Sequence, residues 1–116
     1  MGDQRQEQNV LNECLGKSRK MVGLVSYAVD SIVSKTILDK SAGTVTLFAF
    51  DKGQKLSEHT TPYDAIVEVI DGAGQIIIDG EVNTIGSGEI IIMPANVPHA
   101  VVANEQFKML LIMVRE

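Results

Sequence analysis

The side chains best suited to chemistry in this sequence are its only two histidines, His59 and His99. His99 follows the segment Pro94-Ala95-Asn96-Val97-Pro98. Pro94 cannot donate a hydrogen bond within a sheet, so it marks the end of a strand. Asn96 tolerates the positive φ that a tight turn would need at this point. The segment therefore predicts a turn that presents His99 at the start of the next strand.

Other catalytic arrangements find little support. The single cysteine, Cys14, has no histidine near it in sequence and only Lys17 as a nearby cation, which argues against a reactive thiol. Glu58 should point away from His59 on a strand, and Asp64 lies at a bend. The sequence therefore predicts no pair of carboxylates placed for acid–base catalysis.

Short β-prone runs separated by turn residues make up most of the chain. The predicted strands cover residues 31–39, 44–50, 57–61, 65–70, 75–78, 81–85, 90–93, 100–102 and 107–114, and a β-prone run already begins at 21–27. Asp79-Gly80 predicts a two-residue hairpin, and residues 71–74 predict another turn. This pattern is typical of an all-β sandwich or barrel with about eight to ten short antiparallel strands.

Length, charge and composition exclude several classes of protein. A chain of 116 residues suits one domain, which we place at residues 23–116 after a flexible polar segment at 1–22. The net charge of −5 and the scattered basic residues argue against nucleic acid as a partner. No apolar run reaches the roughly 20 residues of a membrane span. The start lacks the apolar core of a signal peptide, and a lone cysteine suits a reducing compartment, so we expect a cytoplasmic location.

The first histidine lies in a spaced motif. Gly53 is followed by five residues, His59-Thr60-Thr61, three residues, Ala65, six residues and Gly72. This resembles the first motif of the cupin superfamily, which reads glycine, five residues, His-x-His, three or four residues, Glu, six residues, glycine.

The second histidine lies in a matching motif. Gly88 is followed by five residues, Pro94, one residue, Asn96, two residues, His99, three residues and Ala103. The second cupin motif has the same spacing, with glycine at the position of Asn96 and asparagine at the position of Ala103. The resemblance implies the cupin fold, a double-stranded β-helix or jelly-roll barrel.

The resemblance implies only part of a metal site. In metal-binding cupins three histidines and one glutamate hold a divalent ion such as Fe, Mn, Ni or Zn. Here His59 and His99 occupy two of these positions, whereas Thr61 and Ala65 occupy the other two. First-row metal sites generally use three or four protein ligands, so His59 and His99 would hold such an ion weakly, with water completing its shell. Alternatively, the histidines bond to each other, to Thr61 or to water, or they recognise a hydroxyl, carbonyl or carboxylate.

Period-two alternation places one set of side chains in a common interior. The predicted interior residues are Phe48, Phe50, His59, Thr61, Val67, Val69, Met93, His99, Met109 and Met113. Within this set we predict a ligand pocket formed by Phe48, Phe50, His59, Thr61, Met93 and His99, with Tyr63 at its mouth. Methionine is adaptable and suits a pocket that fits its ligand loosely.

Apolar side chains at the alternate positions point to the outer face of the sheet, where they also need to be shielded from water. They include Leu47, Ile90, Ile92, Leu110 and Ile112. We expect a homodimer that buries them, as cupins commonly form, with residues 21–27 exchanged between subunits.

The leading hypothesis is therefore a small cupin barrel that acts as a binding or sensing module for a small molecule and does not catalyse a difficult reaction. The alternative is a metal-dependent cupin enzyme of the dioxygenase, isomerase or lyase type, with its ion on His59 and His99. A third hypothesis is a non-catalytic assembly or accessory protein.

Overall fold

The computed structural model describes residues 9–116, which form eight β-strands and two short 3-10 turns. The strands are β1 (Ile32–Lys40), β2 (Gly43–Phe50), β3 (Lys55–His59), β4 (Asp64–Ile78), β5 (Glu81–Gly86), β6 (Ile90–Met93), β7 (His99–Val102) and β8 (Phe107–Val114). The turns are η1 (Asn12–Cys14) and η2 (Met21–Gly23). The prediction of an all-β fold is confirmed, with eight strands. No helix among the described residues is long and apolar enough to span a bilayer.

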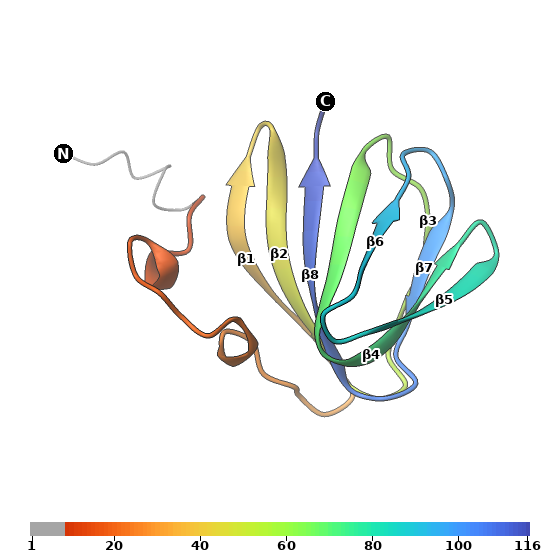
Figure 1. The fold of residues 1–116 in the computed structure, drawn as a ribbon, viewed down its shortest axis with the longest axis horizontal. Coiled ribbons are helices and arrows are strands. Elements are labelled where there is room, and N and C mark those ends of the chain that lie inside the picture. The colour runs from red at the N-terminus through yellow and green to blue at the C-terminus, as the bar shows by residue number, and fades with distance from the viewer. Residues whose placement is uncertain (1–8) are drawn as a thin grey trace.

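The strands pair antiparallel and curl into a half-barrel (Figure 1). Their order is β1-β2-β8-β4-β7-β3, and β5 and β6 also pair with β4. The first half of β4 lies between β8 and β6, and its second half lies between β7 and β5. β4 therefore belongs to both walls of the half-barrel.

The turn predicted at residues 71–74 is wrong, because β4 runs through it from Asp64 to Ile78. The chain bends there instead: its register against β8 shifts between Val69 and Asp71, and Gly72 has a φ of 70°. A bulge with a residue of positive φ bends a strand without ending it. The glycines that indicated a turn thus allow one strand to pass from one wall to the other.

The two other predicted turns are confirmed. Asp79 and Gly80 both have positive φ, at 51° and 80°, and they join β4 to β5 as a tight hairpin. Asn96 has a φ of 64° and lies in the turn between β6 and β7. Its backbone N–H donates to the Thr61 carbonyl oxygen at 2.7 Å, which ties this turn to the end of β3.

Alternating side chains of the two walls meet in one core. The buried members are Phe50, Ala65, Val67, Val69, Ile76, Ile85, Met93, Val101, Ala103, Phe107 and Met109. Phe50 and Phe107 stack at the centre, with ring centroids 4.7 Å apart and planes 7° from parallel. Gly74 of β4 is buried beside this pair, where its missing Cβ leaves room for the Phe107 ring.

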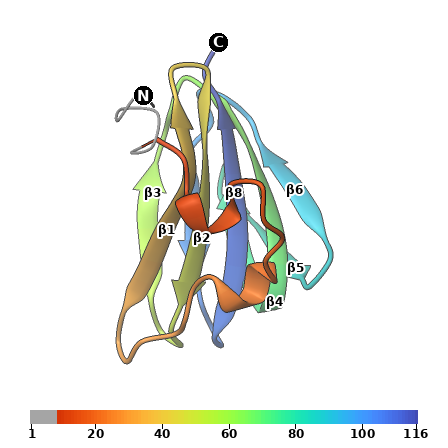
Figure 2. The same ribbon diagram turned by 90° about the vertical axis from the view of Figure 1, so that its left-hand side faces the viewer.

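The outer face of the sheet is partly covered by the chain's own N-terminal segment. Figure 2 shows this segment passing across β2 and β8. Val25 is buried there against Leu47 and Ala49 of β2. Lys108 of β8 donates from its ammonium group to the Val22 carbonyl oxygen at 2.6 Å. Leu47, which we assigned to a dimer interface, is therefore covered within one chain.

The β-prone reading of residues 21–27 is also corrected, because they form η2 and a loop. Met21, Leu24 and Val25 pack in the same outer cluster, which fits their spacing of three and four residues. An alternating strand would have turned part of this set away from the sheet. The predicted flexible segment at 1–22 is described from residue 9 onward, where Leu11 N–H donates to the Ile37 carbonyl oxygen at 2.8 Å.

Candidate functional site

The two histidines meet inside the half-barrel. His59 ends β3 and His99 begins β7, and they are register partners in the β3–β7 ladder. Their Nε2 atoms are 3.1 Å apart, and their rings form an edge-on pair with centroids 4.3 Å apart. His99 is buried, whereas His59 is exposed. The pair therefore connects the interior with solvent.

The other ring nitrogen of each histidine faces its own backbone. His59 Nδ1 lies 2.8 Å from the Ser57 carbonyl oxygen, and His99 Nδ1 lies 3.2 Å from the Val97 carbonyl oxygen. A carbonyl oxygen can only accept, so a hydrogen bond at either of these contacts is donated by Nδ1–H. The two Nε2 atoms face each other at hydrogen-bond distance, 3.1 Å, and the tautomers of the two rings set which of them donates.

The turn before β7 holds His99 in place through several backbone contacts. The Ala95 N–H donates to Asp64 Oδ1 at 2.8 Å, and the Asp79 N–H donates to the Pro98 carbonyl oxygen at 2.8 Å. The turn is thus tied to both ends of β4. Burial lowers the pKa of His99, the nearby His59 acts in the same direction, and the Val97 carbonyl opposes both. These effects favour the neutral imidazole at this position.

A cavity of about 50 Å³ opens beside the histidine pair. Its lining is Leu56, His59, Thr61, Ala65, Met93, His99, Val101, Met109, Leu111 and Met113. Four of the seven predicted pocket residues are therefore brought together: His59, Thr61, Met93 and His99. Met109 and Met113 were predicted for the interior but not for the pocket, and Ala65 was singled out only as a motif position. Leu56, Val101 and Leu111 were missed, although Val101 and Leu111 lie two positions from predicted interior residues on their strands.

The other three predicted pocket residues lie elsewhere. Phe48 and Phe50 pack in the core, with ring centroids 6.0 Å apart, and Phe50 stacks on Phe107. Tyr63 is half-buried in the turn before β4, where its N–H and carbonyl oxygen both contact the Thr61 hydroxyl. Because the two phenylalanines are needed to fill the barrel, they leave the cavity to the smaller side chains around the histidines.

The residues present do not fit the metal site that cupins commonly carry. Thr61 offers a hydroxyl already bonded to its own turn, and Ala65 offers no ligand atom. Among the described residues no group of three or more His, Cys, Asp and Glu side chains is placed to hold an ion. Sites for divalent first-row metals need three or four such ligands, so we derive no metal-dependent reaction from this cavity.

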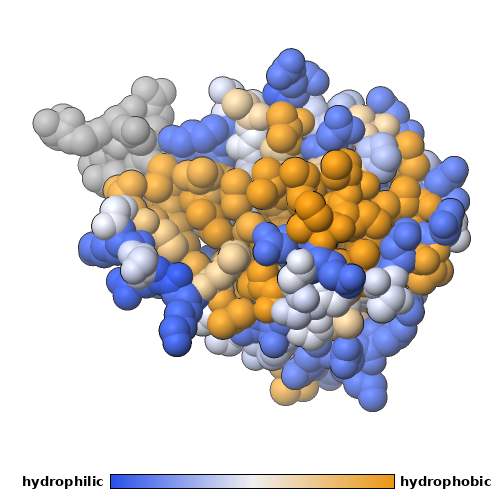
Figure 3. Space-filling view, in the orientation of Figure 1, coloured by the Kyte–Doolittle hydropathy of each residue, from blue (hydrophilic) through white to orange (hydrophobic). Residues whose placement is uncertain are grey.

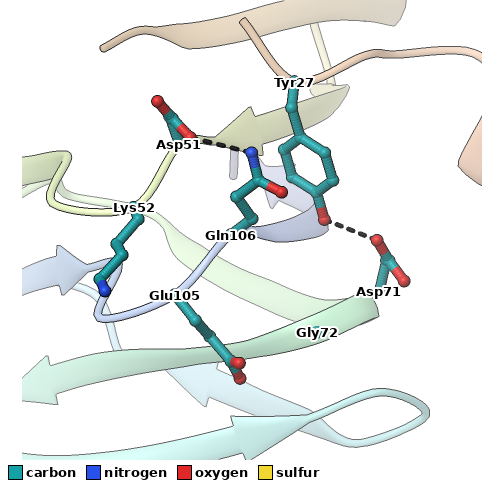
Figure 4. Close-up of a pocket in the computed structure, with 7 residues that line it drawn as sticks. All are labelled: Tyr27, Asp51, Lys52, Asp71, Gly72, Glu105 and Gln106. Atoms are coloured by element: carbon teal, nitrogen blue, oxygen red, sulfur yellow. Dashed lines mark hydrogen bonds between the residues drawn. The ribbon is translucent and has the colours of Figure 1, made fainter. Parts of the chain in front are cut away.

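A second hollow, of about 520 Å³, lies at the other end of β8 (Figure 4). Two pairs of its polar side chains bond to each other: the Tyr27 hydroxyl donates to Asp71 at 2.6 Å, and the Gln106 amide donates to Asp51 at 2.9 Å. Burial and the Asp71 contact raise the pKa of Tyr27 far above its usual value. The Tyr27 contact attaches the N-terminal segment to β4, and we assign the hollow no ligand.

A half-barrel of eight antiparallel strands with paired histidines in its cavity defines a class, the small jelly-roll barrel domain. The chain belongs to the cupin family, since the family model described as "Cupin domain" matches residues 46–115. The predicted cupin fold is thereby confirmed.

Solved structures agree with this assignment. The conserved SPY1581 protein of unknown function from Streptococcus pyogenes is 34% identical, with a TM-score of 0.88, over 93% of this chain and 95% of that one. A cupin 2 conserved barrel domain protein from Leptotrichia buccalis is 42% identical, with a TM-score of 0.80, over 82% of this chain but only 46% of that one. A cupin superfamily protein from Desulfitobacterium hafniense, 21% identical over 93% of this chain and 96% of that one, shares the fold with a TM-score of 0.83. No functionally curated protein matches the chain.

Proposed function

We propose that this cupin domain binds a compact small molecule in its barrel cavity, through the Nε2 atoms of His59 and His99. The observation that carries the proposal is the pairing of these two atoms, 3.1 Å apart, in a cavity whose other lining is almost entirely apolar. A few convergent polar groups in an apolar cavity are the usual composition of a ligand site. An imidazole Nε2 atom donates or accepts a hydrogen bond according to its tautomer, so the pair favours a hydroxyl or a carboxyl group.

The size of the cavity restricts the ligand. Pockets for drug-sized molecules measure about 300–1,000 Å³. The cavity here is about 50 Å³. One buried water needs about 10–15 Å³ of such space, so the cavity holds only a few water-sized groups. The ligand is therefore a molecule of few non-hydrogen atoms, or one that inserts a short polar end past His59.

Methionine methyl NMR provides the test, because Met93, Met109 and Met113 line the cavity and Met21 lies in the outer cluster. We expect acetate, glycolate or ethylene glycol to shift the three cavity methyl signals and to leave the Met21 signal in place. Equal small shifts at all four methyl groups would contradict the proposal.

An Ala65→Val variant provides the matched control. Ala65 is 3% exposed and lines the cavity, so two added methyl groups take up space that the ligand needs. Overpacking typically costs about 1–3 kcal/mol, and a cost of this size in the complex corresponds to a roughly 5- to 150-fold loss of affinity. Unchanged affinity in this variant would place the ligand outside the cavity.

We also propose that the domain forms a homodimer through the uncovered part of the outer sheet face. Ile92 and Ile90 of β6 are 57% and 63% exposed, and Figure 3 shows apolar side chains gathered in a band across this side of the molecule. In a two-fold dimer the same apolar patch of each subunit packs against its copy, so both patches are removed from water and no charged group is buried. The lone cysteine, Cys14, supports a reducing compartment such as the cytoplasm.

An Ile92→Lys variant tests the dimer. We expect the parent protein to sediment as a dimer and the variant as a monomer, because a lysine in the centre of the contact leaves an unpaired buried charge. Val82→Lys is the matched control, since Val82 is 55% exposed on β5, away from this face. A monomeric parent protein, or loss of the dimer in the Val82 variant, would contradict this interface.

A further inference from the structure

Three of the five methionines of the chain line one small cavity: Met93, Met109 and Met113. Met93 of β6 and Met113 of β8 are the register partners of Ala65 on either side. Register partners on antiparallel strands lie on the same face, so these three side chains form one row facing the cavity. Alanine is the short member of the row, and thioether groups bound the space beside it. The proposed ligand contacts involve the histidines and give these thioethers no role.

The three methionines lie at different depths in the cavity. Met113 is half-buried, Met93 is 4% exposed and Met109 is 1% exposed. Met109 lies four residues before Met113 on β8, on the side of the stacked Phe107. A molecule that enters beside the exposed His59 therefore meets Met113 and Met93 before it reaches Met109.

The size and the chemistry of this wall indicate which reagent it suits. The cavity of about 50 Å³ admits only molecules of few non-hydrogen atoms. A thioether is uncharged and does not titrate, and its characteristic reaction is oxidation to a sulfoxide. Hydrogen peroxide is an oxidant only slightly larger than water. Because it is uncharged, it enters an apolar cavity without the large desolvation cost of an ion.

We propose that Met93 and Met113 are a site of oxidation by hydrogen peroxide, and that their sulfoxides close the cavity to its ligand. The sulfur lone pair attacks one peroxide oxygen, so that an S–O bond forms as the O–O bond breaks. The departing hydroxide takes the proton of the transferred oxygen and leaves as water. Sulfur is thereby oxidised by two electrons and the peroxide is reduced. Methionine sulfoxide reductases reverse the change, so the site switches in both directions.

The sulfoxide alters both the volume and the polarity of the cavity. Its added oxygen is comparable in size with one water molecule, which needs about 10–15 Å³ of a cavity that measures about 50 Å³. The S=O group also needs a hydrogen-bond donor, and the Thr61 hydroxyl already donates to the Tyr63 carbonyl oxygen at 3.1 Å. The modification thus regulates the proposed ligand site, and to this extent it rests on the proposed function.

The experiment treats the whole protein with hydrogen peroxide and follows each methionine by peptide mass spectrometry. Met21 is the internal reference, because it is half-buried in the cluster on the outer face of the sheet. We expect Met113 and Met93 to react faster than Met21, and Met109 to react most slowly. Met93 is the decisive residue, because with 4% exposure it would be protected unless peroxide arrives through the cavity.

An Ala65→Val variant tests the route of entry. It narrows the cavity and should lower the rate at Met93 relative to Met21 at least about 5-fold, which corresponds to the smallest usual cost of overpacking. Gly86→Ala is the matched control, since an added Cβ at the end of β5 would meet only the Glu89 side chain. It should leave this ratio unchanged.

A variant with both Met93→Leu and Met113→Leu tests whether the sulfoxides close the cavity. Methionine-to-leucine changes nearly conserve volume, so folding is retained. Without sulfoxides at the mouth, peroxide should oxidise Met109 faster in this variant than in the parent protein. Oxidation should also weaken ethylene glycol binding to the parent at least about 5-fold, the low end of the cost of burying an unpaired polar group, and leave the variant unaffected.

Two results would overturn the proposal. Oxidation of Met93 no faster than that of Met21 would mean that peroxide does not react through the cavity. Equal rates at Met109 in the parent protein and the double leucine variant would mean that the sulfoxides leave the cavity open. All oxidation rates are measured without a ligand, so failure of ethylene glycol to bind would refute the proposed function and not the oxidation site.

Discussion

A Thr61→His, Ala65→Glu double variant should bind Zn(II), Ni(II) or Mn(II) at least about 10³-fold more tightly than the parent protein. Both side chains line the cavity that holds His59 and His99, so the change completes the set of three histidines and one glutamate. Four-ligand zinc sites contribute about 10–16 kcal/mol, or about 3 kcal/mol per ligand, and two added ligands exceed the 4 kcal/mol that this gain needs. Competition titration with each metal gives the affinities directly.

Stability provides an independent measurement on the same variant. Ala65 is 3% exposed, so a glutamate there is buried, and without metal it should lower the midpoint of thermal unfolding. Saturating Zn(II) should more than restore that midpoint, because the ion binds only the folded state. The same double change combined with His99→Gln is the control and should regain much less. If the double variant binds metal no better than the parent, the geometry of this cavity differs from that of metal-binding cupins.

Gly74→Ala should destabilise the barrel strongly, by about 2–4 kcal/mol of unfolding free energy. A Cβ at Gly74 would meet the Cε2 and Cδ2 atoms of Phe107 at 2.5 and 2.8 Å. Phe107 cannot yield easily, because it is fully buried and stacked on Phe50. Urea unfolding of the variant and the parent measures the difference.

Gly86→Ala is the matched control for this prediction. Gly86 ends β5 and its φ is not positive, and an added Cβ there would meet only the Glu89 carboxylate oxygen at 3.4 Å. We expect its stability to change by less than about 0.5 kcal/mol. A similar small loss in the Gly74 variant would mean that the Phe107 ring moves aside, and that the core is looser than its packing indicates.

Local patterns in the sequence predicted much of the fold. Alternation placed Val67, Val69 and Met109 in the core, and the positive φ of Asn96 followed from its place before Pro98. These features depend on neighbours one or two residues away. The continuity of β4 was not predictable in this way, because Gly72 serves a turn and a bulge equally well, and pairing with β8 decides between them.

The candidate site shows the same division. The spacing of the two motifs brought His59, Thr61 and His99 together in the prediction, and the structure places all three at one cavity. The same spacing did not indicate that Phe48 and Phe50 fill the core instead, or that the N-terminal segment covers Leu47. Both outcomes depend on which bulky groups compete for the same volume, and that competition involves residues distant in sequence.

The sequence by itself determined the family, the strand pattern and the identity of the two histidines, since these are written in residue types and short spacings. Only the tertiary structure decided what the histidines can do. It placed each Nδ1 beside a backbone carbonyl oxygen and brought the two Nε2 atoms to hydrogen-bond distance, 3.1 Å. It also gathered methionines from β6 and β8 around them, because side chains from separate strands share a cavity only once the sheet has curled.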